Sequence, residues 1–265
     1  MRLTSTANPR IKAAAELKER SMRERRGLFL IEGFREIERA LAAGLEVVEA
    51  YHAESLDAAE ALLVSRLGAH RSLELFEASA PALKKISSRE NPARLIAVAR
   101  LPRPSLDSFQ PPPAGLLLIS VGLEKPGNLG ALLRSADAAG ADAVLVAGGV
   151  DLYSPQVIRN STGVVFSLPT FSASEREVLD WLRRHQMPTV ATSPHSQQTY
   201  WDVDMRGSVA IVMGAEHQGL GKVWLEGAAH RVRIPMCGQA DSLNVSVAAA
   251  LMLFEARRQR RDGPR

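Results

Sequence analysis

The chain has 265 residues, of which 46% are hydrophobic and 23% charged. This composition excludes a wholly disordered protein and predicts one large or two small domains. Its only cysteine, Cys237, excludes an internal disulfide and a zinc site built from cysteines. The longest apolar runs, Ala114–Val121 and Val245–Phe254, are about half of the roughly 20 residues that a membrane span needs. Because the first residues also lack the apolar stretch of a secretory signal, we expect a soluble cytoplasmic protein.

Positive charge gathers at the two ends of a chain whose formal net charge is only +4. Residues 1–26 hold eight Lys or Arg residues against three Glu residues, and residues 257–265 hold five Arg residues against one Asp. This placement indicates a polyanionic partner such as nucleic acid, although a solvated helix face and a frayed tail would give the same pattern. The N-terminal candidates for contacts with nucleic acid are Arg10, Lys12, Lys18, Arg23, Arg25 and Arg26.

Helices and strands are predicted to alternate over the first hundred residues. Asn8 and Pro9 form a typical helix start, Gly27 interrupts the first helix, and Gly44 ends the second. This order of elements indicates an α/β layer architecture. The expected helices are Pro9–Arg25, Gly33–Ala43, Leu56–Leu67 and Ala80–Ile86, and the expected strands are Leu28–Ile31, Val47–His52, Ser72–Phe76 and Leu95–Ala99.

A proline-rich stretch follows these elements. Five prolines between Leu101 and Ala114 cannot continue a helix or a central strand, and they stiffen the chain. We therefore expect residues 102–113 to be a linker between a first domain, residues 1–101, and a second domain, residues 114–265.

The second domain is predicted to hold an open, mostly parallel sheet. Its first strand, Gly115–Val121, is a continuous apolar run, as expected for a strand buried on both faces. Sheets of this kind bind ligands at the loops beyond the carboxyl ends of their strands. The further expected strands are Ala143–Val146, Thr189–Thr192, Ser208–Met213 and Val232–Ile234, and the expected helices are Asn128–Ala139, Ser174–His185 and Leu243–Arg260.

The first loop of interest, Gly122–Gly130, joins the opening strand to its helix. Its glycine spacing satisfies the first half of a Walker A pattern, but Asn128 and Leu129 stand where a P-loop requires Lys and Ser or Thr. A dinucleotide-binding G-x-G-x-x-G is absent as well. What remains is a helix start, in which Asn128 is a cap or a site residue and Arg134 is a surface or a site residue.

Two further loops follow later strands of the sheet. In Gly214–Leu220, Glu216 lies at the carboxyl edge, where it is a solvated turn residue or an anchor for a hydroxyl or a positive charge. In Ile234–Ser246, helix capping explains Ser242 or Asn244 but not both. The small polar residues of this loop therefore point to a site.

Other chemistries find less support in the sequence. His195 and His217 suggest a base for Ser–His hydrolysis, yet the chain has no G-x-S-x-G elbow. No other cluster of His, Cys and Asp predicts a metal site. Cys237 stands beside the third loop, and we interpret it as a small packed residue.

The order and the residue patterns of the three loops resemble those of a known family. Glu124–Arg134, Gly214–Leu220 and Ile234–Val247 are similar to motifs 1, 2 and 3 of the SpoU (TrmH) class of SPOUT RNA methyltransferases. Three short stretches of the first domain are similar to the substrate-binding extension of the ribosomal-RNA members: Ser5–Lys12, Phe29–Gly33 and Ser88–Pro92.

The resemblance implies a fold and an activity. It implies an L30e-like first domain that binds the RNA substrate, and a SPOUT α/β catalytic domain with a trefoil knot. It also implies a homodimer that transfers a methyl group from S-adenosylmethionine to a ribose 2′-hydroxyl of RNA, which we expect to be 23S ribosomal RNA. This reaction needs no metal and no thiol, because a sulfonium is already a good leaving group and positioning lowers the barrier further.

Residue roles follow from the same resemblance. The catalytic candidates are Arg134, Asn128, Glu216, Ser242 and Asn244. The cofactor-binding candidates are Thr192, Met213, Gly214, Glu216, Ile234, Met236, Ser242 and Leu243. Family members carry Arg-x-Ser-x-Gly where this chain has Arg159-x-Ser-x-Gly163, so Arg159 contacts RNA or is a structural arginine. In the family the arginine of motif 1 is proposed to activate the 2′-hydroxyl. A guanidinium is a poor general base, so we expect Arg134 to fix the adjacent phosphate and polarise the hydroxyl.

Two alternative functions stay open at this point. A non-catalytic RNA-binding protein, with the second domain as a relic or a dimerisation platform, would be favoured by a degenerate motif, and none of the three is degenerate. A transfer-RNA methyltransferase of the same class shares all the chemistry. The separate first domain disfavours it, because transfer-RNA members tend to carry only short helical extensions.

Overall fold

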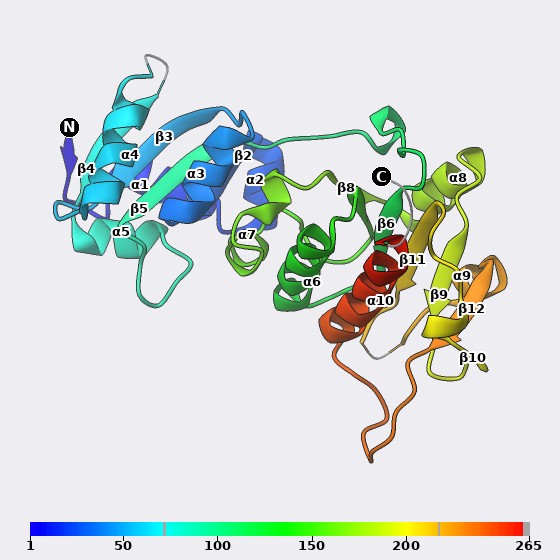
Figure 1. Ribbon diagram of the computed structural model, residues 1–265. Helices are drawn as coiled ribbons and strands as arrows, with labels where there is room; N and C mark the ends of the chain where they lie inside the picture. Colours follow the sequence, from blue (N-terminus) through cyan, green and yellow to red (C-terminus); the bar gives the residue numbers. More distant parts are fainter. Residues whose placement is uncertain (71–72, 217, 262–265) are drawn as a thin grey trace. The chain divides into compact units, whose positions relative to one another are not determined.

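The computed structural model describes residues 1–70, 73–216 and 218–261, and it divides into two compact units (Figure 1). The first unit comprises Met1–Arg103 and Tyr153–Ser167. The second unit comprises Pro104–Leu152 and the chain from Leu168 onward. The segment Tyr153–Ser167 lies in the range that we expected to belong to the second domain, but its contacts join it to the first unit. Within the described ranges, no helix has both the length and the apolar character that a bilayer span demands.

The first unit is built on a mixed five-stranded sheet with the order β1-β4-β3-β5-β2. Strands β1, β4 and β3 run parallel to one another, and β5 is antiparallel to both β3 and β2. The strands are β1 (Arg2–Leu3), β2 (Leu28–Glu32), β3 (Val47–His52), β4 (Glu74–Ala78) and β5 (Leu95–Arg100). The helices are α1 (Pro9–Glu16), α2 (Arg20–Arg26), α3 (Phe34–Ala42), α4 (Ala58–Gly68), α5 (Ala80–Ile86) and α7 (Pro155–Asn160).

The prediction of one helix over Pro9–Arg25 was wrong, because the chain breaks between α1 and α2. Arg23 packs at this break. Its side chain is buried, and its guanidinium donates to the carbonyl oxygens of Leu17, at 2.7 Å, and Lys18, at 2.6 Å. Those carbonyls are free for a side chain only because the helix stops there. Gly27 then ends α2 with φ of 63°, as its residue type predicts.

The second unit holds a seven-stranded sheet with the order β10-β12-β9-β11-β6-β7-β8, and every pair in it is parallel. The predicted α/β fold with a mostly parallel sheet is therefore confirmed. The strands are β6 (Leu116–Val121), β7 (Ala143–Ala147), β8 (Thr170–Ala173), β9 (Thr189–Thr192), β10 (Gln198–Thr199), β11 (Val209–Met213) and β12 (His230–Arg233). The helices are α6 (Pro126–Ala139), α8 (Glu175–Arg184), α9 (Lys222–Glu226) and α10 (Val245–Arg260).

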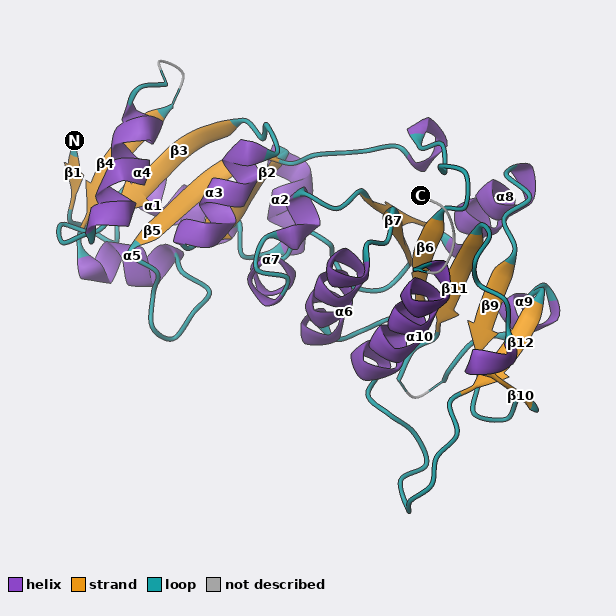
Figure 2. Cartoon of the chain, viewed as in Figure 1, coloured by secondary structure: helices purple, strands orange, loops and turns teal. Residues whose placement is uncertain are grey.

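Helices cover both faces of this sheet (Figure 2). Helices α6 and α10 pack side by side on one face. On the other face, Trp181 of α8 is fully buried in a core with Leu117 and Ile119 of β6. Phe109, from the predicted linker, also packs here, with its ring centroid 5.9 Å from that of Trp181. The proline-rich stretch from Pro104 onward is thus part of the second unit.

The end of α10 is fixed by its basic residues. The guanidinium of Arg260 donates to three carbonyl oxygens, those of Met205 at 2.9 Å, Ala114 at 2.6 Å and Gly207 at 2.7 Å. The preceding Gln259 accepts from the backbone N–H of Met205 at 2.7 Å. Desolvation lowers the pKa of Arg260. Part of the C-terminal basic cluster therefore has a structural role, whereas residues 262–265 lie outside the described chain.

Candidate active site at the carboxyl edge of the parallel sheet

The three loops singled out in the sequence follow β6, β11 and β12 and open α6, a short turn and α10. All three strands are parallel, so these loops leave the sheet at the same edge. Strands β6 and β11 are neighbours, whereas β9 separates β11 from β12. The third loop therefore reaches the others only through its long excursion between residues 234 and 244.

Side chains join the three loops. The amide nitrogen Nδ2 of Asn128, at the start of α6, donates to the Oε1 of Glu216 in the second loop. The Oδ1 of Asn128 accepts from the Nδ2 of Asn244, at the start of α10, at 3.1 Å. One asparagine thus contacts a residue 88 positions and another 116 positions away in the sequence. We call this set of three residues, Glu216, Asn128 and Asn244, the polar bridge.

The structure decides between the capping options that the sequence left open. The N-cap of α6 is Lys125, so Asn128 lies in the first turn and its side chain is free for the polar bridge. Asn244 is the N-cap of α10, and its Oδ1 accepts from the backbone N–H of Ser246 at 3.0 Å. Asn244 therefore caps a helix with its oxygen and holds the polar bridge with its nitrogen. Ser242 is exposed on the loop before it.

The second loop is a tight turn that requires glycine. A Cβ on Gly214 would lie 2.3 Å from the carbonyl carbon of Gly219 and 2.6 Å from the nitrogen of Leu220. The N–H of Gly219 donates to the carbonyl of Ala215 at 3.0 Å, and Gly219 itself has φ of 64°. Backbone approaches backbone here at a distance that no side chain permits. His217 of this loop lies outside the described residues.

Two family models match this chain. The model of the SpoU rRNA Methylase family matches residues 115–254. The model of the MRM3-like substrate binding domain matches residues 8–97. The chain belongs to the SpoU rRNA methylase family. The resemblance stated from the three motifs is therefore confirmed for the second domain, and the substrate-binding character of the first is supported by its own match.

Relatives of similar length extend this assignment over both domains. This SpoU-family chain is 32% identical over 256 residues to a 23S rRNA (uridine(2479)-2′-O)-methyltransferase of Streptomyces viridochromogenes, with 94% of this chain and 89% of the relative covered. It matches the crystal structure of an RNA 2′-O ribose methyltransferase with a TM-score of 0.88 and 61% identity, over 98% of this chain and 99% of the other. The SpoU methyltransferase AviRb from Streptomyces viridochromogenes in complex with AdoMet matches with a TM-score of 0.89 and 32% identity, over 97% and 100% of the two chains.

The expected cofactor residues lie on β9, β11 and the loop after β12. The hydroxyl of Thr192 donates to the carbonyl of Val212 at 3.0 Å and lies 3.6 Å from the sulfur of Met213. Met213 itself is buried. Ile234 is half-buried, whereas Met236 and Leu243 expose 37% and 36% of their surface.

Arg134 lies on the exposed side of α6, in the middle of the helix. Among the described residues, no carboxylate or carbonyl holds its guanidinium. Sequence analysis missed Ser120, which is fully buried and whose hydroxyl has no hydrogen-bond partner in the described chain. It pairs in register with Met213. The signal for it is a single polar residue within an apolar strand.

Four of the six basic residues expected to contact RNA at the N-terminal end have partners inside the first unit. Arg10 makes a bidentate ion pair with Glu74, at 2.5 and 2.9 Å, which raises its pKa. Lys18 donates to a backbone carbonyl at 2.9 Å, and Arg26 donates to another at 2.6 Å. Arg23 is buried, as described above. These four side chains therefore make structural contacts within the first unit.

The remaining basic candidates are more accessible. Lys12 and Arg25 are exposed, and Arg159 is half-buried near the end of α7. None of the three has an ion pair or hydrogen bond with a side chain in the described ranges. In the same ranges, no group of three or more His, Cys, Asp or Glu residues is arranged to hold a metal ion.

Proposed function

We propose that this protein transfers a methyl group from S-adenosylmethionine to a ribose 2′-hydroxyl of 23S ribosomal RNA. The observation that carries the proposal is the polar bridge, which ties together the three loops that hold the motifs of the SpoU family. The names of relatives that align over both domains support the substrate, because they describe 23S rRNA 2′-O-methyltransferases.

S-Adenosylmethionine fits the carboxyl edge of the sheet. The buried hydroxyl of Ser120 lacks a partner in the described chain, and such a group is normally satisfied by a ligand or a water. Gly214 directly follows Met213, the register partner of Ser120, and Met236 and Leu243 offer exposed apolar surface. We assign contact with the cofactor to Thr192, Met213, Gly214, Glu216, Ile234, Met236, Ser242 and Leu243.

The chemistry needs positioning more than acid–base power. When bound, S-adenosylmethionine supplies an electrophilic methyl group on a sulfonium that leaves as a neutral thioether. Arg134 has the free, planar guanidinium that holds a phosphate through two parallel hydrogen bonds and polarises the neighbouring 2′-hydroxyl. Glu216, Asn128 and Asn244 keep the loops in place, and Ser242 orders the third loop. Alignment of reacting groups contributes up to about 7–11 kcal/mol to such a reaction.

RNA contact is assigned to the accessible basic residues of the first unit. Lys12, Arg25 and Arg159 have the freedom to pair with phosphates, because no side chain in the described chain already holds them. The exchange of condensed counterions for such residues makes binding strongly dependent on salt. Arg10, Lys18, Arg23 and Arg26 support this surface indirectly through the contacts described above.

A homodimer is the second part of the proposal. Helix α10 exposes Val247, Leu251 and Phe254, at 49%, 38% and 50% of their surface. Their spacing of four and three residues places them on one face of the helix. An apolar stripe of this kind marks an interaction surface. We expect a charge at this stripe, as in L251E, to convert a dimer into a folded monomer in analytical ultracentrifugation.

Two further properties come from the family resemblance. The trefoil knot of the second unit remains a prediction, as does the cytoplasmic location, which follows from the proposed substrate.

The decisive experiment transfers a labelled methyl group to unmodified ribosomal RNA and then locates 2′-O-methylribose by digestion. We expect label on one ribose of 23S rRNA, and loss of at least about 100-fold in kcat/KM for Arg134→Ala. Arg176→Ala is the matched control, because Arg176 belongs to none of the three loops and its side chain is 93% exposed on α8. Label on a base or on transfer RNA would overturn the substrate assignment, and failure to bind S-adenosylmethionine in calorimetry would favour a non-catalytic RNA-binding protein.

A further inference from the structure

The segment Tyr153–Ser167 connects two neighbouring strands of the parallel sheet, β7 and β8, but belongs to the first unit. The chain therefore leaves the second unit, forms α7 and a short 3-10 turn against the first unit, and returns. Parallel neighbours such as these need a crossover connection of about a dozen or more residues, and here part of that crossover belongs to the first unit. Its contacts show what the detour provides.

An aromatic cluster anchors the two ends of the segment. Phe29 of β2 is fully buried, and its ring centroid lies 5.4 Å from that of Tyr153 and 5.9 Å from that of Phe166. Strand β2 is the edge strand of its sheet, and α7 packs against it. The segment thus covers a strand edge that would otherwise be unprotected.

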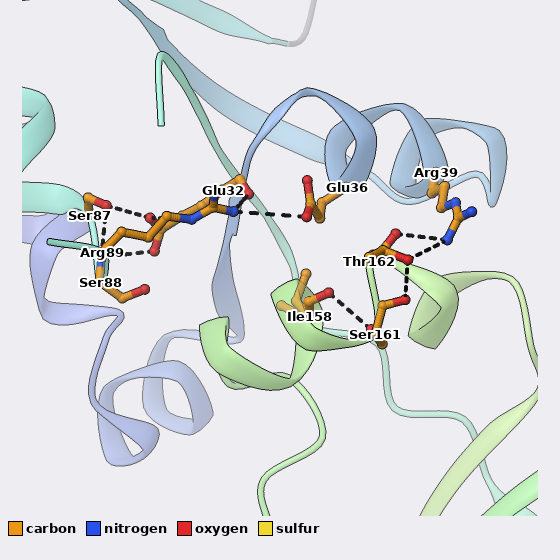
Figure 3. Close-up of polar contacts among 9 residues, drawn as sticks. All are labelled: Glu32, Glu36, Arg39, Ser87, Ser88, Arg89, Ile158, Ser161 and Thr162. Atoms are coloured by element: carbon orange, nitrogen blue, oxygen red, sulfur yellow. Dashed lines mark hydrogen bonds and ion pairs between the residues drawn. The ribbon is translucent and has the colours of Figure 1, made fainter. Parts of the chain in front are cut away.

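A polar contact fixes the middle of the segment (Figure 3). The Nη1 of Arg39, on α3, donates to the carbonyl oxygen of Thr162 at 2.8 Å and to its hydroxyl at 3.1 Å. Thr162 has φ of 53°, in the left-handed region that is strained for a β-branched residue. Gly163 follows it so closely that a Cβ there would lie 3.2 Å from the Cα of Glu36. Arg39 therefore holds a turn that the local sequence does not favour.

The helix that carries Arg39 is itself held firmly. Arg89 pairs with Glu36 of α3 at 3.9 Å and with Glu32 of β2 at 3.8 Å (Figure 3). Glu32 is buried and accepts from the hydroxyl of Ser87 at 2.6 Å and from the N–H of Ser88 at 2.9 Å. These contacts tie α3, which carries Arg39, to β2 and to the loop after α5.

The segment Tyr153–Ser167 carries one arginine that is available to a ligand. Arg159 lies in the last turn of α7, three residues before Thr162, and is half-buried with no partner for its guanidinium in the described chain. A charge that is partly withdrawn from water is normally paired. Helix α2, which carries the exposed Arg25, packs on the same strand β2 as α7 does. Arg25 and Arg159, neither of which has a partner in the described chain, thus lie on two helices that pack on the same strand, β2.

The proposed function assigns Arg159 to a phosphate of the RNA substrate. We propose that Arg39 is the positioning residue that holds α7, and with it Arg159, in place for this contact. The proposal rests on the proposed function for the identity of the RNA. A guanidinium fits a phosphate bidentately, whereas a strained turn without its anchor lets α7 sample other orientations. Arg39 acts only through Arg159 and does not touch RNA.

The test compares R39M, R159M and R39M/R159M in the full-length chain. Methionine at residue 39 keeps the apolar stem that packs on Gly163 and removes only the hydrogen-bond donors. R66M is the matched control, because Arg66 makes an exposed ion pair with Glu38 of the same helix α3, at 3.6 Å. Filter binding of a 23S rRNA transcript at several salt concentrations measures affinity. Calorimetry measures binding of S-adenosylmethionine, and thermal unfolding reports folding.

We expect R159M to weaken RNA binding about tenfold and to lower the slope of log K against log[salt] by about 0.7–0.9, the value for one lost phosphate contact. R39M should reproduce both changes, and the double variant should be no more than about twofold weaker than R159M, because the two residues act in series. Affinity for S-adenosylmethionine should stay within about twofold of wild type in all three variants, as should every measurement on R66M.

Three results would overturn the proposal. R159M with wild-type affinity and salt slope would remove the phosphate contact. R39M with a lowered melting temperature but an unchanged salt slope would make Arg39 a purely structural residue. Multiplicative losses in the double variant would show that Arg39 acts independently of Arg159. RNA binding is measured without methyl transfer. These comparisons can therefore be interpreted even if the protein does not methylate 23S rRNA.

Discussion

The polar bridge offers the most direct test of how the three loops are held together. Asn128 donates to Glu216 through its nitrogen and accepts from Asn244 through its oxygen. The substitution Asn128→Asp keeps the size of the side chain and the acceptor toward Asn244, but it replaces the donor with a second carboxylate oxygen facing Glu216. Two unit charges about 4 Å apart repel by about 4 kcal/mol at an effective dielectric constant of 20 and by about 1 kcal/mol in water.

Both side chains are half-buried, so the cost lies between these limits. A midpoint of about 2.5 kcal/mol corresponds to roughly a 70-fold loss of kcat/KM at pH 8 if the loops must be joined for catalysis. Lower pH should relieve the defect, because two carboxylates in contact share a proton more readily than either would bind one alone, and the shared proton restores a hydrogen bond between them. The activity of N128D relative to wild type should therefore rise between pH 8 and pH 5.5.

Methyl transfer to ribosomal RNA, measured as the ratio of variant to wild type at each pH, isolates this effect from the pH dependence of the reaction itself. Asn128→Ala is the control, since it removes the donor without adding a charge, and its ratio should be flat with pH. Parallel flat profiles for N128D and N128A would refute the charge argument. Wild-type activity of N128D at pH 8 would show that catalysis does not require the bridge between Asn128 and Glu216.

Three other substitutions probe the fold and the site. Gly214→Ala should abolish binding of S-adenosylmethionine in calorimetry, because the new Cβ would overlap backbone atoms. Gly221→Ala is the control: its Cβ would meet nothing within 4 Å, so this variant should bind S-adenosylmethionine like the wild type. Equal binding by both variants would contradict the tight turn. Arg260→Met should lower the free energy of unfolding in urea by about 2–4 kcal/mol, since three carbonyls lose a charged donor, and a change below about 0.5 kcal/mol would mean that water replaces it. Burial, followed by the hydrogen bond to Glu49, raises the pKa of Tyr51, so above pH 10 the unfolded chain releases a proton that the folded chain keeps. Stability should then fall by up to about 1.4 kcal/mol per pH unit, and Tyr51→Phe should reduce that slope in urea unfolding at pH 9 and 11; an unchanged slope would assign it to other groups.

Local patterns predicted the regular elements of this chain well where the signal lies within a few residues. The strands Val47–His52 and Thr189–Thr192 and the helix Ala80–Ile86 have the bounds that alternating apolar runs and caps predicted. The apolar runs of β6 and β11 differ from prediction by one residue at their start. Such signals act between neighbours along the chain, so no tertiary contact is needed to interpret them.

Short elements and breaks were not predictable in this way. Strands β1 and β10 have two residues each, and they count as strands only because β4 and β12 lie beside them. For these two strands a partner distant in the sequence outweighs local propensity. At the break between α1 and α2, the buried Arg23 donates to the carbonyls of Leu17 and Lys18, a contact that the sequence pattern did not predict.

The site shows the same division. By itself the sequence determined that three polar, glycine-containing loops follow parallel strands. The order and the residue patterns of these loops identified the family. Only the tertiary structure decided that Asn128 contacts Glu216 and Asn244, and that Asn244 is the residue that caps α10. It also decided that most of the N-terminal basic residues pair within the first unit, as Arg10 does with Glu74 across 64 positions. Charge, glycine and apolar periodicity are properties of a stretch of chain, whereas the partner of a side chain depends on which distant stretches packing brings within hydrogen-bonding distance.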